Sequence, residues 1–304
     1  MQNKPLLICV IGPTAIGKTA LAIKIAKHFS TEIISADSRQ FYKEMTIGTA
    51  VPNKEELAEI PHHFIQNRSI IEDYSVGDFE RDALELLNSL FETKDVIVLV
   101  GGSGLYIDAV IKGLDKFPEV PINIIEDLKS EFESQGIEPL QKELLAKDPF
   151  YYNKVDLENH HRIIRALGVC RVQELPYSSF LNAKKEPRSF KTITIGLTAD
   201  REIIYNRINQ RVDIMMEEGL ENEAKNLHSH KNLNALKTVG YRELFNYFEG
   251  EYSKEVAVEE IKKNTRRFAK RQGTWFRKNK DIHWFDYKTK LLDILNIIIN
   301  AQKK

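Results

Sequence analysis

The sequence predicts an α/β fold: a parallel sheet with helices on both faces, the three-layer α/β/α arrangement of P-loop NTPases, plus a helical insertion domain. Three observations lead to this prediction. Continuous apolar runs alternate with helical patterns, and the glycine-rich motif Gly12–Thr19 joins the first run to the first helix. Strand signals then vanish between about residues 115 and 188 of the 304-residue chain, which is long enough for a domain with an inserted subdomain.

The first half of the chain supplies most of the predicted sheet. Leu6–Ile11 is apolar without alternation, the pattern of a buried parallel strand. Ala20–Phe29 has helical spacing, and Glu32–Ser35 is a second short strand. Phe79–Phe91 is an amphipathic helix, and Asp95–Val100 is a third strand. Ligands of such sheets bind beyond the carboxyl ends of the strands, so the site is expected there.

The middle of the chain has helical character instead. Charged helical patterns at Ile124–Ser134 and His161–Gln173 precede Ser189–Leu197, which has the pattern of another core strand. From Asp200 onward we expect mostly helix to the end. The domain boundaries that we predict are 1–115 together with 189–304 for the core and 116–188 for the insertion.

Bulk composition excludes several classes of protein. The 44 Lys and Arg balance 44 Asp and Glu, so any polyanion site must come from local clustering of charge. Cys9 and Cys170 are expected to be buried reduced thiols. Met1–Leu7 has no signal-peptide pattern, and the late apolar stretch Leu291–Ala301 is too short to span a bilayer. We therefore expect a cytoplasmic protein without membrane contact. A monomeric state is a separate expectation.

The glycine-rich motif predicts a phosphate site, because it fits G-x-x-x-x-G-K-[ST] between a strand and a helix. Its glycines let backbone N–H groups converge on phosphate oxygens at a helix N-terminus. Lys18 adds a positive charge, and the Thr19 hydroxyl is placed to bind Mg²⁺. The alternative is a purely structural turn. The predicted phosphate-binding residues are Gly12, Pro13, Thr14, Ala15, Ile16, Gly17, Lys18 and Thr19.

Such a motif by itself suggests a nucleotide kinase or an ATPase. The third strand ends in Gly101-Gly102-Ser103 where an ATPase would have a carboxylate, and the switch segments of a GTPase are not visible. A small-molecule kinase stays open, because such enzymes often have an acid after the second strand, as Asp37 is here.

Longer stretches of sequence are more specific. They are GPTAIGKT (12–19), ISADSRQFYKEMTIGTAVP (34–52), PHHF (61–64), YSVGDFERDA (74–83), VLVGGSGLY (98–106), HRIIRALGV (161–169), RINQRVDIMMEEGL (207–220), KTVGYRE (237–243) and TRRFAKRQGTWFRK (265–278). In this order, over nearly the whole chain, they resemble the tRNA dimethylallyltransferases, also called tRNA isopentenyltransferases. The resemblance implies transfer of a dimethylallyl group from dimethylallyl diphosphate to N6 of adenine 37 in the anticodon loop of tRNA.

The resemblance also implies roles in catalysis. Asp37 matches the base that accepts the proton of the adenine amine; otherwise it is a turn or cap acid, or an outer contact of Mg²⁺. Arg211 matches the residue that reaches the diphosphate, with Arg207 one turn earlier as a rival, and either could instead form a surface ion pair. Ser103 and Thr14 supply hydroxyl groups near the reacting atoms. Ser103 stands where the family more often has threonine.

Binding of tRNA is predicted from charge as well as from the resemblance. Ile261–Lys280 contains nine Lys or Arg and no acid, with Phe268, Trp275 and Phe276 among them. The alternative is a solvated helix face with three core aromatics. The helical insertion is expected to grip the RNA stem. The residues expected to contact tRNA are Asp37, Ser38, Arg39, Gln40, Ser103, His161, Arg162, Ile163, Ile164, Arg165, Lys237, Thr238, Val239, Gly240, Tyr241, Arg242, Arg266, Arg267, Lys270 and Arg271.

Some residues depart from the family pattern. Arg39 stands where many relatives have a small or apolar residue, and Glu243 where glutamine is common. His62 and His63 have no third metal ligand at suitable spacing, so hydrogen bonding or packing roles are favoured. Three rival functions stay open: a small-molecule kinase, a non-catalytic RNA-binding protein with a vestigial P-loop, and transfer to free adenosine monophosphate. The long insertion argues against the last.

Overall fold

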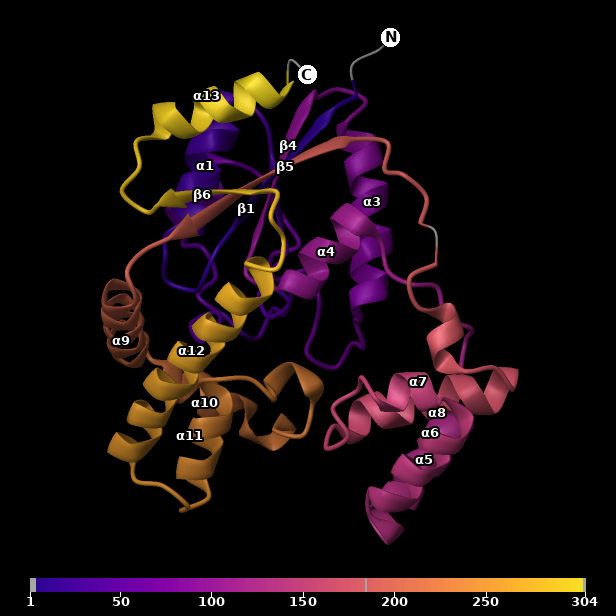
Figure 1. Cartoon of the computed structure of the whole chain (residues 1–304). Helices are drawn as coiled ribbons and strands as arrows, with labels where there is room; N and C mark the ends of the chain where they lie inside the picture. Colours follow the sequence, from indigo (N-terminus) through magenta and orange to yellow (C-terminus); the bar gives the residue numbers. More distant parts are fainter. Residues whose placement is uncertain (1–3, 184, 303–304) are drawn as a thin grey trace. The chain divides into compact units, whose positions relative to one another are not determined.

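The computed structural model describes residues 4–183 and 185–302 (Figure 1). They form two compact units, the first within Met1–Lys112 and Arg188–Lys304 and the second within Gly113–Pro187. The division expected from the sequence lies at 115/116 and 188/189. Residues 1–3 of the N-terminal segment lie outside the described residues.

The first unit contains a six-stranded sheet in the order β3-β2-β4-β1-β5-β6, and every strand pair in it is parallel. The strands are β1 Leu6–Ile11, β2 Ile33–Ser35, β3 His62–His63, β4 Val96–Gly101, β5 Lys191–Thr198 and β6 Ile282–Asp286. The order crosses over at β1, which sits between β4 and β5. The parallel sheet confirms the predicted fold class.

Side chains of β1 alternate between the two faces of the sheet. Leu7, Cys9 and Ile11 join one core with α3 (Val76–Leu90) and α4 (Gly104–Lys112). Their neighbours along the strand join another core with α1 (Lys18–His28) and α13 (Leu291–Gln302). Figure 1 shows these two helix pairs on opposite sides of the strands. The three-layer arrangement is therefore confirmed.

The rest of the first unit is a group of helices with a core of its own. They are α9 (Arg201–Glu217), α10 (Leu220–Leu227), α11 (Tyr241–Phe248) and α12 (Lys254–Phe276), with short 3₁₀ turns η2 (His228–His230) and η3 (Asn234–Leu236). The short helix α2 (Lys54–Glu59) precedes β3 and contributes no buried residue. The core of the helical group also receives Tyr42 and Met45 from the segment after β2. Because α12 contacts α4, α9 and α11, it joins this group to the sheet.

The second unit is helical. It comprises α5 (Ile122–Gln135), α6 (Glu138–Lys147), α7 (Pro149–Tyr152), α8 (His160–Gln173) and η1 (Tyr177–Phe180). Leu128, Leu144, Leu167 and Cys170 belong to its core. The two helical patterns read from the sequence are confirmed as α5 and α8, whereas the tRNA-binding role of this unit stays a prediction.

Two strands were not expected from the sequence. The chain after residue 200 is mostly helical, as predicted, but it also forms β6, and β3 was not predicted at all. Both are edge strands, and β3 has only two residues. Only Ile282 of β6 is buried, so β6 lacks the apolar run that identifies an inner strand. The strand β6 forms through parallel pairing with β5.

The structure also bears on two expectations from composition, the state of the cysteines and the presence of membrane-spanning helices. Cys9 and Cys170 are buried and unpaired, as predicted. Within residues 4–183 and 185–302, no helix combines the length and apolar character needed to cross a membrane.

Candidate active site

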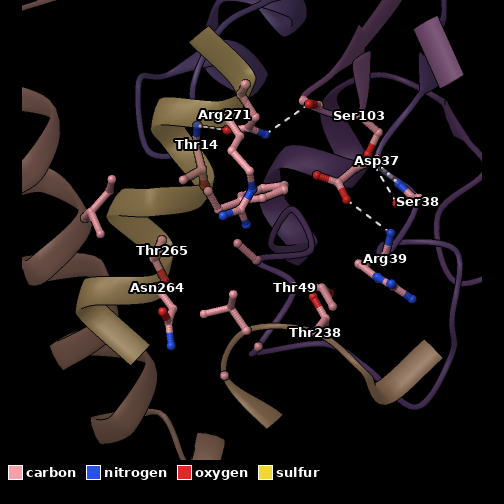
Figure 2. Close-up of a pocket in the computed structure, with 18 of the residues that line it drawn as sticks. Thr14, Asp37, Ser38, Arg39, Thr49, Ser103, Thr238, Asn264, Thr265 and Arg271 are labelled. Atoms are coloured by element: carbon pink, nitrogen blue, oxygen red, sulfur yellow. Dashed lines mark hydrogen bonds between the residues drawn. The ribbon is translucent and has the colours of Figure 1, made fainter. Parts of the chain in front are cut away.

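A cavity of about 630 Å³ opens at the carboxyl ends of β1, β2 and β4. Its lining comes from the P-loop, the segments after β2 and β4, the helices α9 and α12, and the segment before α11. In Figure 2, Thr14 and Arg271 lie on one side of the cavity, and Asp37, Ser38 and Ser103 lie on the other. The fold therefore brings six separated segments of the sequence to one place.

The P-loop has the backbone that its motif predicts. Gly12 and Gly17 have φ angles of 147° and 105°, which strain residues with a side chain. A Cβ at Gly12 would also lie 2.7 Å from the carbonyl oxygen of Leu197 in β5. Gly17 is the N-cap of α1 and makes no side-chain cap hydrogen bond. The first amides of α1 thus have no side-chain cap and face the end of the sheet, where an anion is stabilised.

Lys18 and Asp37 interact electrostatically at this cradle. The Lys18 ammonium donates a 2.8 Å hydrogen bond to the carbonyl of Pro13. Exclusion from water lowers the pKa of Lys18 to about 8, with Asp37 acting against the shift and Arg211 adding to it. Exclusion from water raises the pKa of Asp37, while the backbone N–H of Arg39, 3.1 Å from Oδ1, and the neighbouring cations oppose the rise. Asp37 is a carboxylate with increased proton affinity next to two cations.

Of the two candidate arginines on α9, Arg211 lines the cavity with Asp37. Burial lowers the pKa of its guanidinium, Arg207 adds to this, and Asp37 opposes it. Arg207 makes a different contact: its Nε donates a 2.7 Å hydrogen bond to the carbonyl of Ala15 in the P-loop. Its guanidinium also lies 5.4 Å from the ring centre of Tyr287. Arg211 therefore faces the cavity, whereas Arg207 supports the P-loop through its hydrogen bond to Ala15.

Ser103 faces the segment that follows Asp37. Its Oγ accepts a 3.1 Å hydrogen bond from the backbone N–H of Ser38 and lies 3.2 Å from the Ser38 hydroxyl (Figure 2). The hydroxyl predicted near the acceptor amine is therefore in the cavity, and it also joins the segment after β4 to the segment after β2. The side-chain amide of Gln40, by contrast, bonds within the segment after β2, where it donates to the carbonyls of Thr49 and Ala50.

The basic stretch forms most of α12, and the structure corrects one expectation about it. Its nine cations are not all unopposed. Lys262 pairs with Asp213 at 2.8 Å and Glu259 at 3.0 Å, and Lys263 pairs with Glu260 at 2.6 Å. These acids lie outside residues 261–280, so counting the charges within that range did not include them. The other seven make no ion pair among the described residues: Arg266, Arg267, Lys270, Arg271, Arg277, Lys278 and Lys280.

The three aromatic residues of this stretch divide between core and cavity. Phe276 is buried in the core beneath the sheet, as the structural alternative expected. Phe268 and Trp275 are 38% and 40% exposed, and both line the cavity. The Trp275 indole N–H donates a 2.8 Å hydrogen bond to Asp108 in α4. Two aromatic faces and the guanidinium of Arg271 therefore stand along one wall.

Comparison with known proteins decides the family. A family model described as IPP transferase matches residues 40–279. The chain belongs to the IPP transferase family. It is 57% identical to a tRNA dimethylallyltransferase of Flavobacterium johnsoniae, with 98% of each chain covered. It is 59% identical to another of that name from Christiangramia forsetii, covering 96% of this chain and 97% of the relative.

Solved structures agree with this membership. The crystal structure of a tRNA isopentenylpyrophosphate transferase from Bacillus halodurans has a TM-score of 0.74 and 35% identity, covering 99% of this chain and 97% of that one. A eukaryotic dimethylallyltransferase captured acting on tRNA has a TM-score of 0.81 at 24% identity, over 93% of this chain and 74% of that one. The second likeness shows the shared fold. The resemblance read from the sequence motifs is confirmed.

Not all residues predicted to contact tRNA in this IPP transferase family member are exposed. The ring of Tyr241 is fully buried, and its hydroxyl donates a 2.6 Å hydrogen bond to Glu223. In the second unit, Ile163 and Ile164 face the helical core, whereas Arg162 and Arg165 on the same helix are exposed. These three side chains are core residues of their motifs, and their contact with tRNA stays a prediction. His161 is exposed.

The segment of residues 237–242 lines the cavity with all its residues predicted to contact tRNA except Tyr241. Lys237, Thr238, Val239, Gly240 and Arg242 line it. This segment is held by Glu243, which is 2% exposed and is one of the departures from the family pattern. Glu243 accepts hydrogen bonds from the Gly240 N–H at 2.8 Å, from Arg242 at 2.8 Å and from Asn264 at 2.9 Å. The departure thus caps α11 and lies beneath the cavity wall.

Arg39, the other departure, joins two walls of the cavity. Its Nη1 donates to the carbonyls of Asn234 at 2.9 Å and Ala235 at 3.1 Å. These carbonyls belong to η3, directly before the Lys237 segment. Its side chain therefore connects the segment of Asp37 to the segment that lines the far side.

His62 and His63 have hydrogen-bonded roles. His62 Nδ1 lies 2.7 Å from the carbonyl oxygen of Ile60, and His63 Nε2 lies 2.7 Å from a carboxylate oxygen of Glu32. Both are in edge strand β3. The predicted hydrogen-bonding role is confirmed.

Several cavity residues were missed by sequence reasoning. Gln272 of α12 lines the cavity between the P-loop and the segment after β4. Asn264 and Thr265 line it about two turns earlier on α12. Their signal was available, because Asn264 lies seven residues before Arg271 and Thr265 lies seven residues before Gln272, a spacing that places each pair on one helix face. The search by charge passed over these neutral side chains.

Proposed function

We propose that this chain transfers a dimethylallyl group from dimethylallyl diphosphate to N6 of adenine 37 in the anticodon loop of tRNA. One observation carries the proposal: Asp37 and Arg211 line one cavity beside the P-loop lysine, Lys18. A proton acceptor and cationic groups therefore meet at one cavity of about 630 Å³. The curated relatives named above are called tRNA dimethylallyltransferases, in accord with this chemistry.

The acceptor side requires a base, because the lone pair of an exocyclic adenine amine is delocalised into the ring. In the proposed step, the N6 lone pair forms a bond to C1 of the dimethylallyl group. The bond between C1 and the bridging oxygen breaks, and its electron pair leaves with the diphosphate. Asp37 takes the proton that N6 loses, which contributes about 10²–10⁴-fold for a positioned base. Its raised pKa suits this role.

The donor side requires positive charge that is already in place. Negative charge accumulates on the diphosphate as the bond to C1 breaks, and preorganised cations and amides stabilise that charge. Lys18, Arg211 and the first amides of α1 provide them. We propose that Gly12–Thr19 holds the diphosphate through its backbone, with Thr14 at the side that faces the cavity.

The residues of the P-loop also fit Mg²⁺. Thr19 lies in the first turn of α1, partly exposed, and its hydroxyl has no hydrogen-bond partner within residues 4–183 and 185–302. A hydroxyl in this position, together with water and diphosphate oxygens, is an oxygen ligand set of the kind that Mg²⁺ prefers. We propose that Thr19 contributes to holding the ion, which would neutralise diphosphate charge when bound.

The tRNA side is proposed to include the cavity wall of α12. Arg267, Arg271 and Trp275 line the cavity on this helix, so guanidinium groups and an aromatic face adjoin the place where the base must enter. RNA loops are read by stacking and by contacts to the base edges and backbone, and extruding a loop base costs only a few kcal/mol. A cytoplasmic location and a monomeric state stay predictions.

The decisive experiment incubates the purified protein with dimethylallyl diphosphate and unmodified tRNA, followed by digestion of the RNA and detection of N6-dimethylallyladenosine. Formation of this nucleoside is expected. Consumption of ATP with a small acceptor, and no prenylated nucleoside, would instead identify a kinase, a hypothesis that the comparisons do not support.

Two control reactions separate the remaining alternatives. Adenosine monophosphate in place of tRNA tests the transfer to a free nucleotide and is expected to give no product. An Asp37→Ala variant tests the non-catalytic RNA-binding hypothesis, which predicts that all function survives the substitution. We expect tRNA binding to persist and turnover to be lost.

A further inference from the structure

Gln272 is a buried amide on the helix that carries the predicted RNA-binding arginines. It is 6% exposed, although it lies directly after the exposed Arg271. Its Oε1 accepts a 2.9 Å hydrogen bond from the backbone N–H of Thr14, and its Nε2 donates a 3.0 Å hydrogen bond to the carbonyl of Gly102. One side chain of α12 therefore binds the P-loop and the segment after β4 at once.

The two contacted residues stand beside the reacting groups. Thr14 is part of the donor cradle and lines the cavity, and Gly102 directly precedes Ser103 on the acceptor side. The amide spans the gap between them with both of its polar ends satisfied. Since a buried amide is costly without partners, its position indicates a fixed spacing between the two segments.

Gly102 shows how closely this amide fits. A Cβ at Gly102 would lie 2.3 Å from Nε2 of Gln272 and 3.8 Å from Nζ of Lys18. The first distance is far shorter than any van der Waals contact allows, so a side chain at this position would displace the amide. The need for glycine here arises from the space that Gln272 fills, which makes the two residues a matched pair.

We propose that Gln272 is a positioning residue that sets the distance between the donor cradle at Thr14 and the acceptor segment at Ser103, and that it ties both to the tRNA-facing helix α12. The inference rests on the proposed function. It places the control of reaction geometry in a neutral side chain whose hydrogen bonds hold the two segments rather than in a charged group. A displacement of about 1 Å between reacting groups costs about 10²-fold in rate.

The test measures turnover and tRNA affinity separately in a Gln272→Met variant. Methionine has nearly the same volume and removes both hydrogen bonds. We expect kcat with saturating substrates to fall about 10²-fold, while the Kd for tRNA stays within about two-fold and the variant stays folded by thermal denaturation. Thr274→Ala on the same helix is the matched control and is expected to leave both quantities unchanged, because Thr274 is exposed and bonds only to its own helix.

Two results would overturn the inference. One is a folded Gln272→Met variant with wild-type kcat. The other is a variant whose loss appears wholly in tRNA affinity. Neither result touches the proposed function, which fails only if the wild-type protein itself forms no prenylated nucleoside.

A double-mutant cycle tests the matched pair and remains informative if either single variant is damaged in stability. Gly102→Ala alone is expected to lower kcat by displacing the amide. In a Gln272→Ala background the space is free, so adding Gly102→Ala is expected to change kcat by no more than about two-fold. Fold-losses that simply multiply in the double variant would show that the two positions act independently and would refute the proposal.

Discussion

At the scale of single residues, the site depends on charges whose environments shift their proton affinities in opposite directions. Burial disfavours the ionised form of each group, so it raises the pKa of Asp37 and lowers that of Lys18. The attraction between the two opposes both shifts. The result is a carboxylate that accepts a proton readily and an ammonium that loses one more easily than in water.

The role of Asp37 is tested by replacing it with asparagine. Asp37→Asn keeps the shape of the side chain and removes its capacity to accept the amine proton. We expect kcat to fall about 10²–10⁴-fold with little change in tRNA affinity. Single-turnover prenylation and filter binding of tRNA measure the two quantities. Turnover close to wild type would rule out Asp37 as the base.

The pKa of Lys18 predicts a pH dependence of donor capture. A lysine is charged below its pKa, so in the free enzyme the ammonium is lost as pH rises through about 8. We expect kcat/KM for dimethylallyl diphosphate to decline above this pH, because this parameter reports groups of the free enzyme. Lys18→Arg retains its charge and is expected to lack this decline, even with lower activity overall. The same decline in both proteins would assign it to another group.

At the scale of elements, one carboxylate of α10 orders a segment of the cavity wall. Glu223 accepts backbone hydrogen bonds from Thr46, Ile47 and Gly48 at 3.0, 2.8 and 2.9 Å. It also accepts the hydroxyl hydrogen of Tyr241. A Cβ at Gly48 would lie 2.7 Å from the Tyr241 ring, so this glycine is required by close approach. The buried Tyr241 therefore acts on the site through the wall that it supports.

Replacing Glu223 tests this arrangement. Glu223→Gln leaves backbone donors facing an amide group, and we expect the free energy of unfolding to fall by about 1–3 kcal/mol. Denaturant unfolding measures the change. Glu221→Gln on the same helix is the control: its partly exposed pair with Lys254 is expected to contribute at most about 1 kcal/mol. Equal losses in the two variants would contradict the special role of Glu223.

At the scale of the whole molecule, zero net charge hides an uneven distribution. The sequence carries 44 positive and 44 negative side chains, yet seven cations of the segment 261–280 have no carboxylate partner among the described residues. The attraction to RNA must therefore come from one part of the surface. Binding that depends on such a cluster releases counterions and weakens with salt.

The salt dependence of tRNA binding tests this distribution. Lys270→Gln is expected to make the slope of log K against log salt shallower by about 0.7, the value for one phosphate contact with a single strand. Titrations at several salt concentrations provide the slope. Lys24→Gln on α1 removes the same charge from an exposed site outside the cluster and should leave the slope unchanged. Equal changes of the slope in the two variants would mean that tRNA binding depends on the total charge of the protein and not on the cluster within residues 261–280.

The sequence alone determined the features that depend on local pattern. Apolar runs located β1, β2, β4 and β5, because inner parallel strands are buried on both faces. The P-loop was readable because its glycines, lysine and threonine must be adjacent in the chain. The charge and family motifs brought Asp37, Arg211 and Ser103 into consideration.

Only the tertiary structure decided what depends on partners distant in the chain. Edge strand β6 exists through its pairing with β5, and the cations Lys262 and Lys263 are neutralised by acids outside their own stretch. The same applies to Gln272, whose two hydrogen bonds reach residues more than a hundred positions away. The partners of these groups are set by the folded neighbourhood, so no local pattern could assign them.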